Sequence, residues 1–411
     1  MEHPSKDILS SKSSLLAGKK IALGVCGSVG AVRAPDLARE LMRNGAEVYA
    51  VMTDAAQSII SPELMEWATG NPVVTRLTGR IEHVVLGGGM PGCADLILIA
   101  PATANTISKI ALGIDDTPVT TLATTAIGAR IPIIIAPAMH GSMYSHPAVL
   151  ENMKRLGSMG IAVIPPRESE GKAKIAEPEA IVNTVISALA EKDLKGQRVL
   201  VTAGPTRSYL DPVRYLTNSS SGRMGMALAS EAMSRGAEVT LVLGPTALSP
   251  PSCRTIPVET TDEMMTAVLG ELKSSCYNLL AMAAAPLDFS FSRRLKEKIS
   301  SEASLTVSLV PLPKVVREAR KADPGLFIIG FKAEHNIPAE ELEKRAAGRL
   351  SDSGMDMIVA NDLSKPGAGF ISETNEVVII TKGGKRRRLP KMPKRSVARA
   401  VLDEYVAKRG K

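Results

Sequence analysis

The stretch "KIALGVCGSVGAVRAPDLARELMRNGAEVYAVMT", residues 20–53, decides the fold. Two apolar runs, 20–26 and 46–53, enclose a segment with apolar residues at helical spacing that ends at Gly45. Near-continuous apolar runs are typical of parallel strands covered on both faces, and a glycine after a helical pattern is typical of a helix end. The stretch therefore predicts a strand–helix–strand unit of a doubly wound α/β sheet.

The pattern continues along the chain and then starts again. The stretch "ASEAMSRGAEVTLVLG", 229–244, echoes "ARELMRNGAEVYAVMT", 38–53, with Gly236 in the place of Gly45. We therefore expect two three-layer αβα, Rossmann-like domains, at 18–192 and 193–411, after a disordered polar tail at 1–17. The further strands that we expect are 94–100, 131–137 and 161–165, and then 197–204, 237–244, 277–285, 325–331 and 356–362.

Composition limits the classes of protein. Of 411 residues 45% are hydrophobic and 22% charged, an ordinary globular balance, whereas aromatic residues make up only 3%. So few aromatic rings argue against stacking surfaces for single-stranded nucleic acid. The four cysteines show no C-x-x-C spacing, and no apolar run reaches the length of a membrane span. We expect a cytoplasmic protein without nucleic-acid or membrane partners.

The positive charge is concentrated at the end of the chain. The formal charge is +8, yet residues 382–411 hold twelve Lys or Arg against two acids, which leaves the remaining chain slightly negative. A solvated hairpin and helix face is one interpretation. Attraction of a polyphosphate or an acidic surface is the other.

The first turn does not have the dinucleotide pattern. Gly24, Gly27 and Gly30 are spaced G-x-x-G-x-x-G, and Thr53 stands where an acid for a ribose would end the second strand. A second loop, "APATANTISKIALGIDD" at 100–116, places hydroxyl and amide groups before a helix, where an anion is favoured. The two loops fit a mononucleotide such as FMN, although a glycine-rich turn without a ligand is the alternative.

The stretches "GVCGSVGAV", "IAPATANTISKIALGIDD" and "PAMHGSMY" resemble the flavin-dependent cysteine decarboxylase family, over about residues 18–190. The resemblance implies a flavodoxin-like fold, trimers with FMN at the subunit contact, and His83 as the catalytic base. His140 replaces an asparagine that contacts the substrate carboxylate in that family. The FMN-binding residues that the resemblance implies are Gly27, Ser28, Val29, Thr53, Thr103, Asn105 and Thr106.

The expected flap departs from the family. Many members have an A-C-G run whose cysteine protonates the product, but this chain reads "ESEGKAKIAEP" at 168–178. Ala173 and Lys174 stand at the matching place. Lys174 could act as the acid, bind the substrate phosphate or be solvated, and the sequence leaves these three roles open.

The stretch "VTAGPTRSYLDPVRYLTNSSSGRMG", 201–225, resembles the phosphopantothenate–cysteine ligase domain, and the resemblance covers about residues 194–411. It implies that Asn218 stabilises an acyl-nucleotide intermediate. A helix that begins near Gly222 would also offer free N–H groups to a phosphate. The residues that would hold the substrate phosphate are Ser220, Ser221, Gly222 and Arg223.

Relatives of this ligase type use CTP with Mg²⁺, so the resemblance implies a CTP site with the metal near Asp288. The family often has spaced lysines that meet the triphosphate; here Lys344, Arg345 or Arg349 could substitute for them, and the basic loop at 385–388 could assist. The implied CTP residues are Ala284, Asp288, Lys298, Pro313, Lys314, Val315, Val316, Phe331 and Arg349.

The two resemblances together predict a bifunctional enzyme of coenzyme A biosynthesis. CTP-dependent ligation of 4′-phosphopantothenate with cysteine would precede FMN-dependent decarboxylation to 4′-phosphopantetheine. A trimer-based homo-oligomer, up to a dodecamer, is expected. The alternative is a flavoprotein regulator, or a prenyltransferase-like flavoprotein fused to a ligase-like domain.

Overall fold

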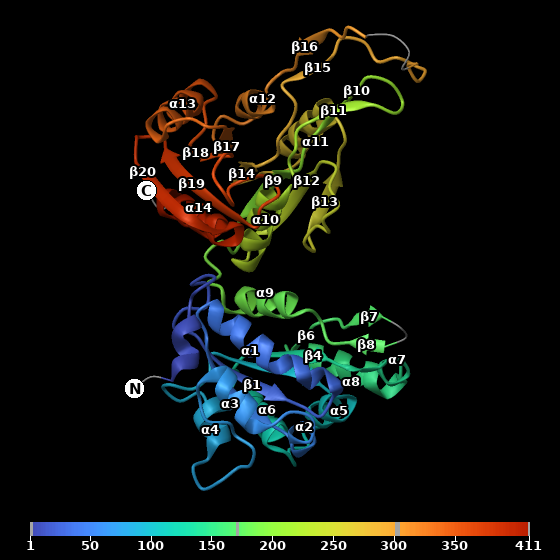
Figure 1. Ribbon diagram of the computed structural model, residues 1–411, viewed down its shortest axis with the longest axis vertical. Helices are drawn as coiled ribbons and strands as arrows, with labels where there is room; N and C mark the ends of the chain where they lie inside the picture. Colours follow the sequence, from blue (N-terminus) through green and yellow to red (C-terminus); the bar gives the residue numbers. More distant parts are fainter. Residues whose placement is uncertain (1–2, 170–171, 301–304, 410–411) are drawn as a thin grey trace. The chain divides into compact units, whose positions relative to one another are not determined.

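The computed structural model describes residues 3–169, 172–300 and 305–409. The chain divides into two compact units, Met1–Ala190 and Glu191–Lys411, which are described separately. Each contains one large, mostly parallel sheet (Figure 1). The α/β class expected from the sequence is therefore confirmed.

The first unit is built on a five-stranded parallel sheet with the order β2-β1-β3-β4-β6. This is the flavodoxin-like order. The strand order reverses between β1 and β3, which makes the gap between these two strands the topological switch point of the sheet. All five expected strands are present. They are β1 (Lys20–Val25), β2 (Glu47–Met52), β3 (Leu96–Ala102), β4 (Ile133–Pro137) and β6 (Ala162–Val163).

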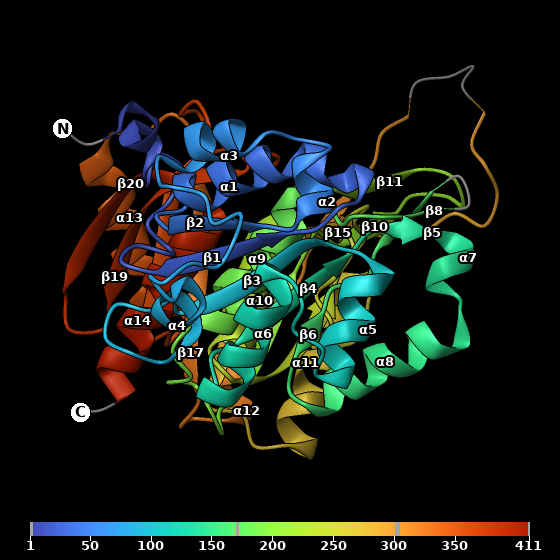
Figure 2. The same ribbon diagram turned by 90° about the horizontal axis from the view of Figure 1, so that it is seen from below.

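Helices cover both faces of this sheet, because alternate strand residues point to opposite sides. Ile21 and Leu23 belong to one core, with α1 (Ala34–Arg43), α3 (Pro62–Thr69) and α9 (Pro178–Leu189). Ala22 belongs to the other core. That core is closed by α4 (Glu82–Gly87), α5 (Ala104–Leu112), α6 (Pro118–Ala129) and α8 (Pro147–Ser158). Figure 2 shows the two helical layers on opposite sides of β1, β3 and β4.

The expectation of a disordered tail is wrong for residues 3–17. They include a short 3-10 helix, Pro4–Ile8, and Leu16 is fully buried in the core of the first unit. The main-chain N–H of Leu16 donates to the Asn44 oxygen over 2.8 Å, and the Ser13 hydroxyl lies 2.7 Å from the Asn44 side chain. Polar composition was misleading because the segment is held largely by hydrogen bonds at the end of α1.

The second unit contains an eight-stranded sheet with the order β13-β12-β9-β14-β17-β18-β19-β20. The first six strands run parallel, whereas β19 pairs antiparallel with β18 and β20 pairs antiparallel with β19. The five expected strands are β9 (Arg198–Ala203), β12 (Glu238–Leu243), β14 (Leu279–Met282), β17 (Phe327–Glu334) and β18 (Met357–Asp362). Three further strands extend the sheet: β13 (Arg254–Pro257), β19 (Thr374–Thr381) and β20 (Arg386–Pro393).

Two helical layers complete the second unit as well. Val199 and Val201 of β9 pack in the core formed with α10 (Arg223–Ser234) and α14 (Lys394–Arg409). Leu200 packs on the opposite side. The helices of that side are α11 (Thr261–Ser274), α12 (Val315–Ala322) and α13 (Ala339–Asp352). Both units therefore have the expected three layers. None of the helices among the described residues is long and apolar enough to cross a membrane.

The repeated helix–strand pattern corresponds to repeated structure. Gly45 and Gly236 follow α1 and α10, with φ angles of +102° and +89°. Their N–H groups bond back to Met42 and Met233 at 2.8 and 2.9 Å. A left-handed backbone favours glycine, which explains why both positions carry it.

The cations of the basic hairpin at 385–388 are exposed to solvent, but each of them also contacts a buried acid. Lys385 and Arg387 contact the buried carboxylate of Glu404, with N···O distances of 2.9 and 3.2 Å. Arg386 and Arg388 contact Glu343, which is also buried, over 2.9 and 2.7 Å. The two carboxylates offset two of the four positive charges, so part of the local charge is paired within the fold and the rest stays in a solvated hairpin.

Candidate active sites

The second unit has a cavity of about 670 Å³ at the carboxyl ends of its central strands. It is the edge where ligands bind in open parallel sheets. Residues at or just after the carboxyl ends of β14, β17 and β18 line it, together with the stretch 217–224. Every residue predicted for the ligase half except Lys298 lines this cavity. They are Asn218, Ser220, Ser221, Gly222, Arg223, Ala284, Asp288, Pro313, Lys314, Val315, Val316, Phe331 and Arg349.

Lys298 is exposed and lies outside this lining. Its neighbour Ile299 donates through its main-chain N–H to Asp211, and Asp211 accepts two further main-chain N–H bonds at 2.7 Å. The Arg214 guanidinium also contacts Asp211, at 3.0 Å. The D-P-V-R motif therefore anchors the segment around Lys298 to the hairpin of β10 (Arg207–Tyr209) and β11 (Tyr215–Thr217).

The start of α10 offers main-chain N–H groups to the cavity. Gly222 precedes the helix with φ of +80°, and no side chain caps it. The Ser220 hydroxyl accepts from the Gly222 N–H at 3.4 Å, whereas the Ser221 hydroxyl donates to the Phe370 carbonyl. An uncapped helix start of this kind favours an anion.

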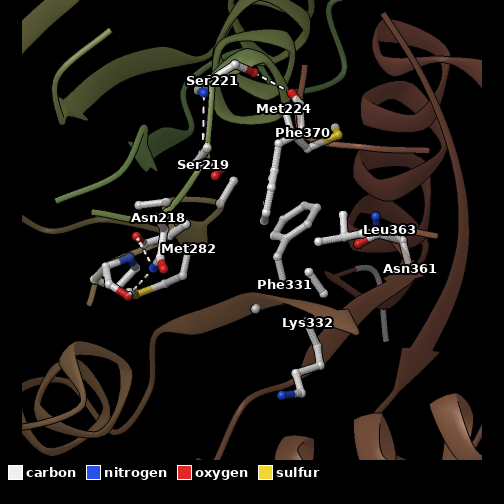
Figure 3. A pocket seen from close by; sticks show the side chains of 18 of the residues that line it. Asn218, Ser219, Ser221, Met224, Met282, Phe331, Lys332, Asn361, Leu363 and Phe370 are labelled. Atoms are coloured by element: carbon white, nitrogen blue, oxygen red, sulfur yellow. Dashed lines mark hydrogen bonds between the residues drawn. The ribbon is translucent and has the colours of Figure 1, made fainter. Parts of the chain in front are cut away.

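The side chain of Asn218 already donates hydrogen bonds within the protein. Its side-chain Nδ2 donates to the main-chain oxygens of Ala285 and Pro286, at 3.0 and 3.2 Å. Figure 3 shows these bonds on one side of the Phe331 ring, with Leu363 and Asn361 on the other side. An amide nitrogen has two hydrogens. Donation to an acyl oxygen would therefore require one of these bonds to break.

The cations near the expected triphosphate are unequally placed. Lys314 is paired with Asp288. No cluster of three or more possible metal-ligating side chains occurs in the described parts of the chain. Arg345 contacts Glu341 at 2.8 Å and Glu334 at 3.4 Å. Of the three alternatives at this place, the structure puts Arg349 at the cavity.

Several cavity residues were missed by the sequence reasoning. Asn361 is the next-to-last residue of the expected strand 356–362, and a polar residue near the carboxyl end of a strand was a signal that could have indicated it. Lys332 follows Phe331, contacts Glu334 at 3.2 Å and points away from the labelled side chains in Figure 3. Lys394 lay within the basic run that was interpreted as a whole.

The first unit has a cavity of about 440 Å³. Ser28, Val29, His140 and Lys174 line it, which brings together four predicted residues. The flap strands β7 (Arg167–Ser169) and β8 (Lys172–Lys174) form one wall, and β8 pairs with β5 (Met139–His140). His140 Nδ1 lies 2.9 Å from the Ser142 hydroxyl, at the start of the helical turn Gly141–Tyr144.

The other predicted FMN residues lie at the same edge of the sheet but outside the lining of this cavity. The Thr53 N–H donates to Val25, and the Cys26 N–H donates to Pro101, so the loops after β1, β2 and β3 meet. A side chain on Gly27 would lie 2.4 Å from the Ala55 side chain. The residues concerned are Gly27, Thr53, Thr103, Asn105 and Thr106.

The chemistry of this donor set fits a flavin mononucleotide. Thr53 and Thr103 cap α2 (Asp54–Gln57) and α5, with N···O distances of 3.3 and 3.2 Å, and Asn105 is exposed in the first turn of α5. Neutral hydroxyls, an amide and main-chain N–H groups suit a phosphate and a ring edge. They surround the point between β1 and β3 where ligands of this fold bind.

His83 lies on α4, which packs against α6. It is half-buried, and its Nδ1 is buried without a hydrogen-bond partner in the described structure. It does not line the 440 Å³ cavity. One chain therefore brings together His140 and Lys174 but leaves His83 outside.

Comparisons with known proteins cover nearly the whole chain. The family model Flavoprotein matches residues 9–190, and the model DNA/pantothenate metabolism flavoprotein C-terminal domain matches 194–408. The coenzyme A biosynthesis bifunctional protein CoaBC of Thermococcus kodakarensis is 51% identical over 406 residues, 98% of this chain and 99% of that protein. The namesake from Methanocaldococcus jannaschii is 40% identical over 92% of each chain.

Among solved structures, the C-terminal domain of a coenzyme A biosynthesis bifunctional protein CoaBC is 32% identical. It covers 54% of this chain and 99% of its own, with a TM-score of 0.45. The extent and identity of the sequence matches decide the family. The chain belongs to the family of coenzyme A biosynthesis bifunctional proteins CoaBC.

Proposed function

We propose that the chain catalyses two consecutive steps of coenzyme A biosynthesis. Residues 193–411 would join 4′-phosphopantothenate to cysteine with CTP, and residues 18–192 would decarboxylate the product, 4′-phosphopantothenoylcysteine, to 4′-phosphopantetheine. The observation that carries the proposal is the 670 Å³ cavity, which collects an uncapped helix start, an aromatic ring and several cations on one edge of the sheet. Membership of the family supports it.

In the ligase half, the phosphopantothenate carboxylate would attack the α-phosphorus of CTP and release pyrophosphate. The cysteine amine would then attack the acyl carbon and release CMP. Arg223 and the start of α10 are proposed to hold the substrate phosphate, and Phe331 to lie against the cytosine. Asn218 would give one of its two N–H groups to the acyl oxygen.

The cations at the cavity would hold the triphosphate of CTP. Lys314 and Arg349 are the residues proposed for this, and both line the cavity. A Mg²⁺ ion would be bound mainly by phosphate oxygens, with Asp288 as one possible protein ligand, because Mg²⁺ commonly keeps few protein carboxylates. The pairing of Asp288 with Lys314 would have to open for this contact.

In the decarboxylase half, FMN supplies a two-electron oxidation that makes loss of CO₂ from the cysteinyl group possible. His140 is proposed to donate to the substrate carboxylate, and His83 to take up a proton. Lys174 would either donate a proton or hold the substrate phosphate. His83 lies outside the cavity of its own chain, so the proposal includes a trimer-based oligomer in which a second copy completes the site.

The direct test is a mass-spectrometric assay of the purified protein with phosphopantothenate, cysteine and either CTP or ATP. We expect CTP to give the decarboxylated product with release of pyrophosphate and CO₂, and the protein to show flavin absorption. His83→Asn should stop at the carboxylated adduct, while Asn218→Ala should block ligation but still decarboxylate added adduct. Protein that consumes no CTP with both acceptors present would refute the proposal.

The partners proposed are small molecules, and the location proposed is the cytoplasm. All four cysteines are free, which supports a reducing compartment.

A further inference from the structure

Lys394, the first residue of α14, is buried in the wall of the 670 Å³ cavity with only 7% of its surface exposed. Its Nζ donates to the main-chain oxygens of Gly369 and Phe370 at 3.2 and 3.1 Å. It forms no ion pair with any acid of the described residues. A buried ammonium without a counter-charge is costly, so this arrangement favours an anion supplied from outside the chain.

A second cation lies at the same place. Arg223 begins α10, and its Nε is buried without a hydrogen-bond partner in the described structure. Its Nη1 contacts Glu373 at 2.5 Å, but the Glu373 side chain is 73% exposed. Burial, and after it the nearby Arg223 charge, lower the pKa of Lys394 to about 8, although Glu373 opposes the shift. Among the described residues, Lys394 and Arg223 therefore have only the exposed Glu373 as a nearby acid, which leaves this end of the cavity with a net positive charge.

The fold fixes these two cations together. Glu231 of α10 is fully buried and accepts from Arg399 at 2.9 Å and from Arg395 at 3.3 Å, both on α14. The two helices pack against each other, so the starts of both face one end of the cavity.

The loop 219–222 meets Lys394 through one shared acceptor. The Phe370 carbonyl accepts from the Ser221 hydroxyl and also from Lys394 Nζ. Figure 3 shows Ser221 and Phe370 at one end of the cavity, on the far side of Phe331 from Lys332. An ammonium has three N–H groups, and two of them are used by the carbonyls. The third N–H can reach a ligand beside the start of α10.

We propose that Lys394 binds phosphoryl oxygens in this cavity, together with Arg223 and the main-chain N–H groups at the start of α10. The ligand is a phosphate group, carried either by the pantothenate-derived substrate or by the nucleotide. The choice of these two molecules as the source of the phosphate rests on the proposed function. A lysine serves as a point charge for phosphate, and a helix start adds directed N–H groups.

The test measures binding to the full-length protein by isothermal titration calorimetry. The variant is Lys394→Met, and the matched control is Lys391→Met, which removes the same charge from an exposed position outside the cavity. The ligands are phosphopantothenate, pantothenate, Mg–CTP, cytidine and inorganic pyrophosphate. We expect Lys394→Met to weaken at least one phosphate-bearing ligand by about 10- to 100-fold, the usual effect of losing a charged hydrogen bond.

The ligands without phosphate distinguish binding from a structural effect. Pantothenate and cytidine should bind Lys394→Met as they bind the wild type, and Lys391→Met should bind all five ligands unchanged. A loss confined to phosphopantothenate identifies the substrate phosphate, and a loss confined to Mg–CTP identifies the nucleotide. Lys394→Arg should recover most of the lost affinity, since it keeps the charge.

Two results would overturn the inference: unchanged affinity of Lys394→Met for every phosphate-bearing ligand, or an equal loss for pantothenate and cytidine. If Lys394→Met does not fold, Lys394→Gln keeps two N–H donors for the two carbonyls and takes its place. Wild-type protein that binds pyrophosphate but never ligates would sink the proposed function alone. An active wild type whose Lys394 variants bind phosphate normally would sink this inference alone.

Discussion

Replacing Glu231 by glutamine should strongly destabilise the second unit. Glu231 is fully buried and pairs with Arg395 and Arg399, so the variant leaves two partly buried guanidinium groups without their carboxylate. Removing one partner of a buried ion pair costs about 3–5 kcal/mol. In a domain of this size each kcal/mol lowers Tm by about 2–4 °C, so the expected fall is about 6–20 °C.

Differential scanning calorimetry of the full chain provides the assay. Glu238→Gln is the matched control, because Glu238 is 70% exposed and its contact with Arg198, at 3.4 Å, lies at the surface. Surface pairs contribute about 0–1 kcal/mol. Trp67, the single tryptophan, lies in the first unit, and its fluorescence transition should not move. A Glu231→Gln transition within 2 °C or so of the control would refute the reasoning, since it would show that the two arginines need no acid.

Three further predictions follow from single sites. Gly244→Ala should lower the urea midpoint, because its Cβ would lie 1.9 Å from a main-chain oxygen, whereas Gly270→Ala has open space and should not; equal midpoints would contradict this. Burial raises the pKa of Cys26 to about 11, so at pH 8 a thiol reagent followed by mass spectrometry should label exposed Cys276 first, and equal rates would disprove it. Hydrogen bonds from Ser364 lower the Asp362 pKa to about 2, so the stability it adds is complete above its unfolded pKa and lost as pH falls through about 2. Asp362→Asn should unfold more easily in urea at pH 7, and no difference there would exclude this contribution.

The sequence predicted the sheets well because buried parallel strands are apolar along their whole length. β1 and β9 were placed within a residue of their observed ends, since a turn that contains glycine follows each of them. The prediction of disorder at 3–17 was wrong because hydrogen bonds, and not apolar runs, hold most of this segment. β13 has two half-buried and two exposed residues, so it lacks the apolar signal that marked the central strands.

The candidate sites were predicted to different degrees for a physical reason. Residues in or just after the carboxyl-terminal half of a strand, such as Phe331 of β17 and Ala284 after β14, reach the cavity because the carboxyl ends of parallel strands share one edge. Lys298 lies on a long excursion whose path depends on Asp211, and spacing along the chain does not reveal such a path. Lys394 was hidden because a run of twelve cations has no local feature that distinguishes the one turned inward.

The edge strand β20 gives the basic run a second consequence. β20 ends the eight-stranded sheet, and it carries three successive arginines followed by Pro390, Lys391 and Pro393. An outermost strand has backbone groups that another chain could pair with, and charges and prolines hinder such pairing. The arginines of β20 that pair with Glu343 and Glu404 thus also hinder this edge strand from pairing with another chain, which opposes aggregation.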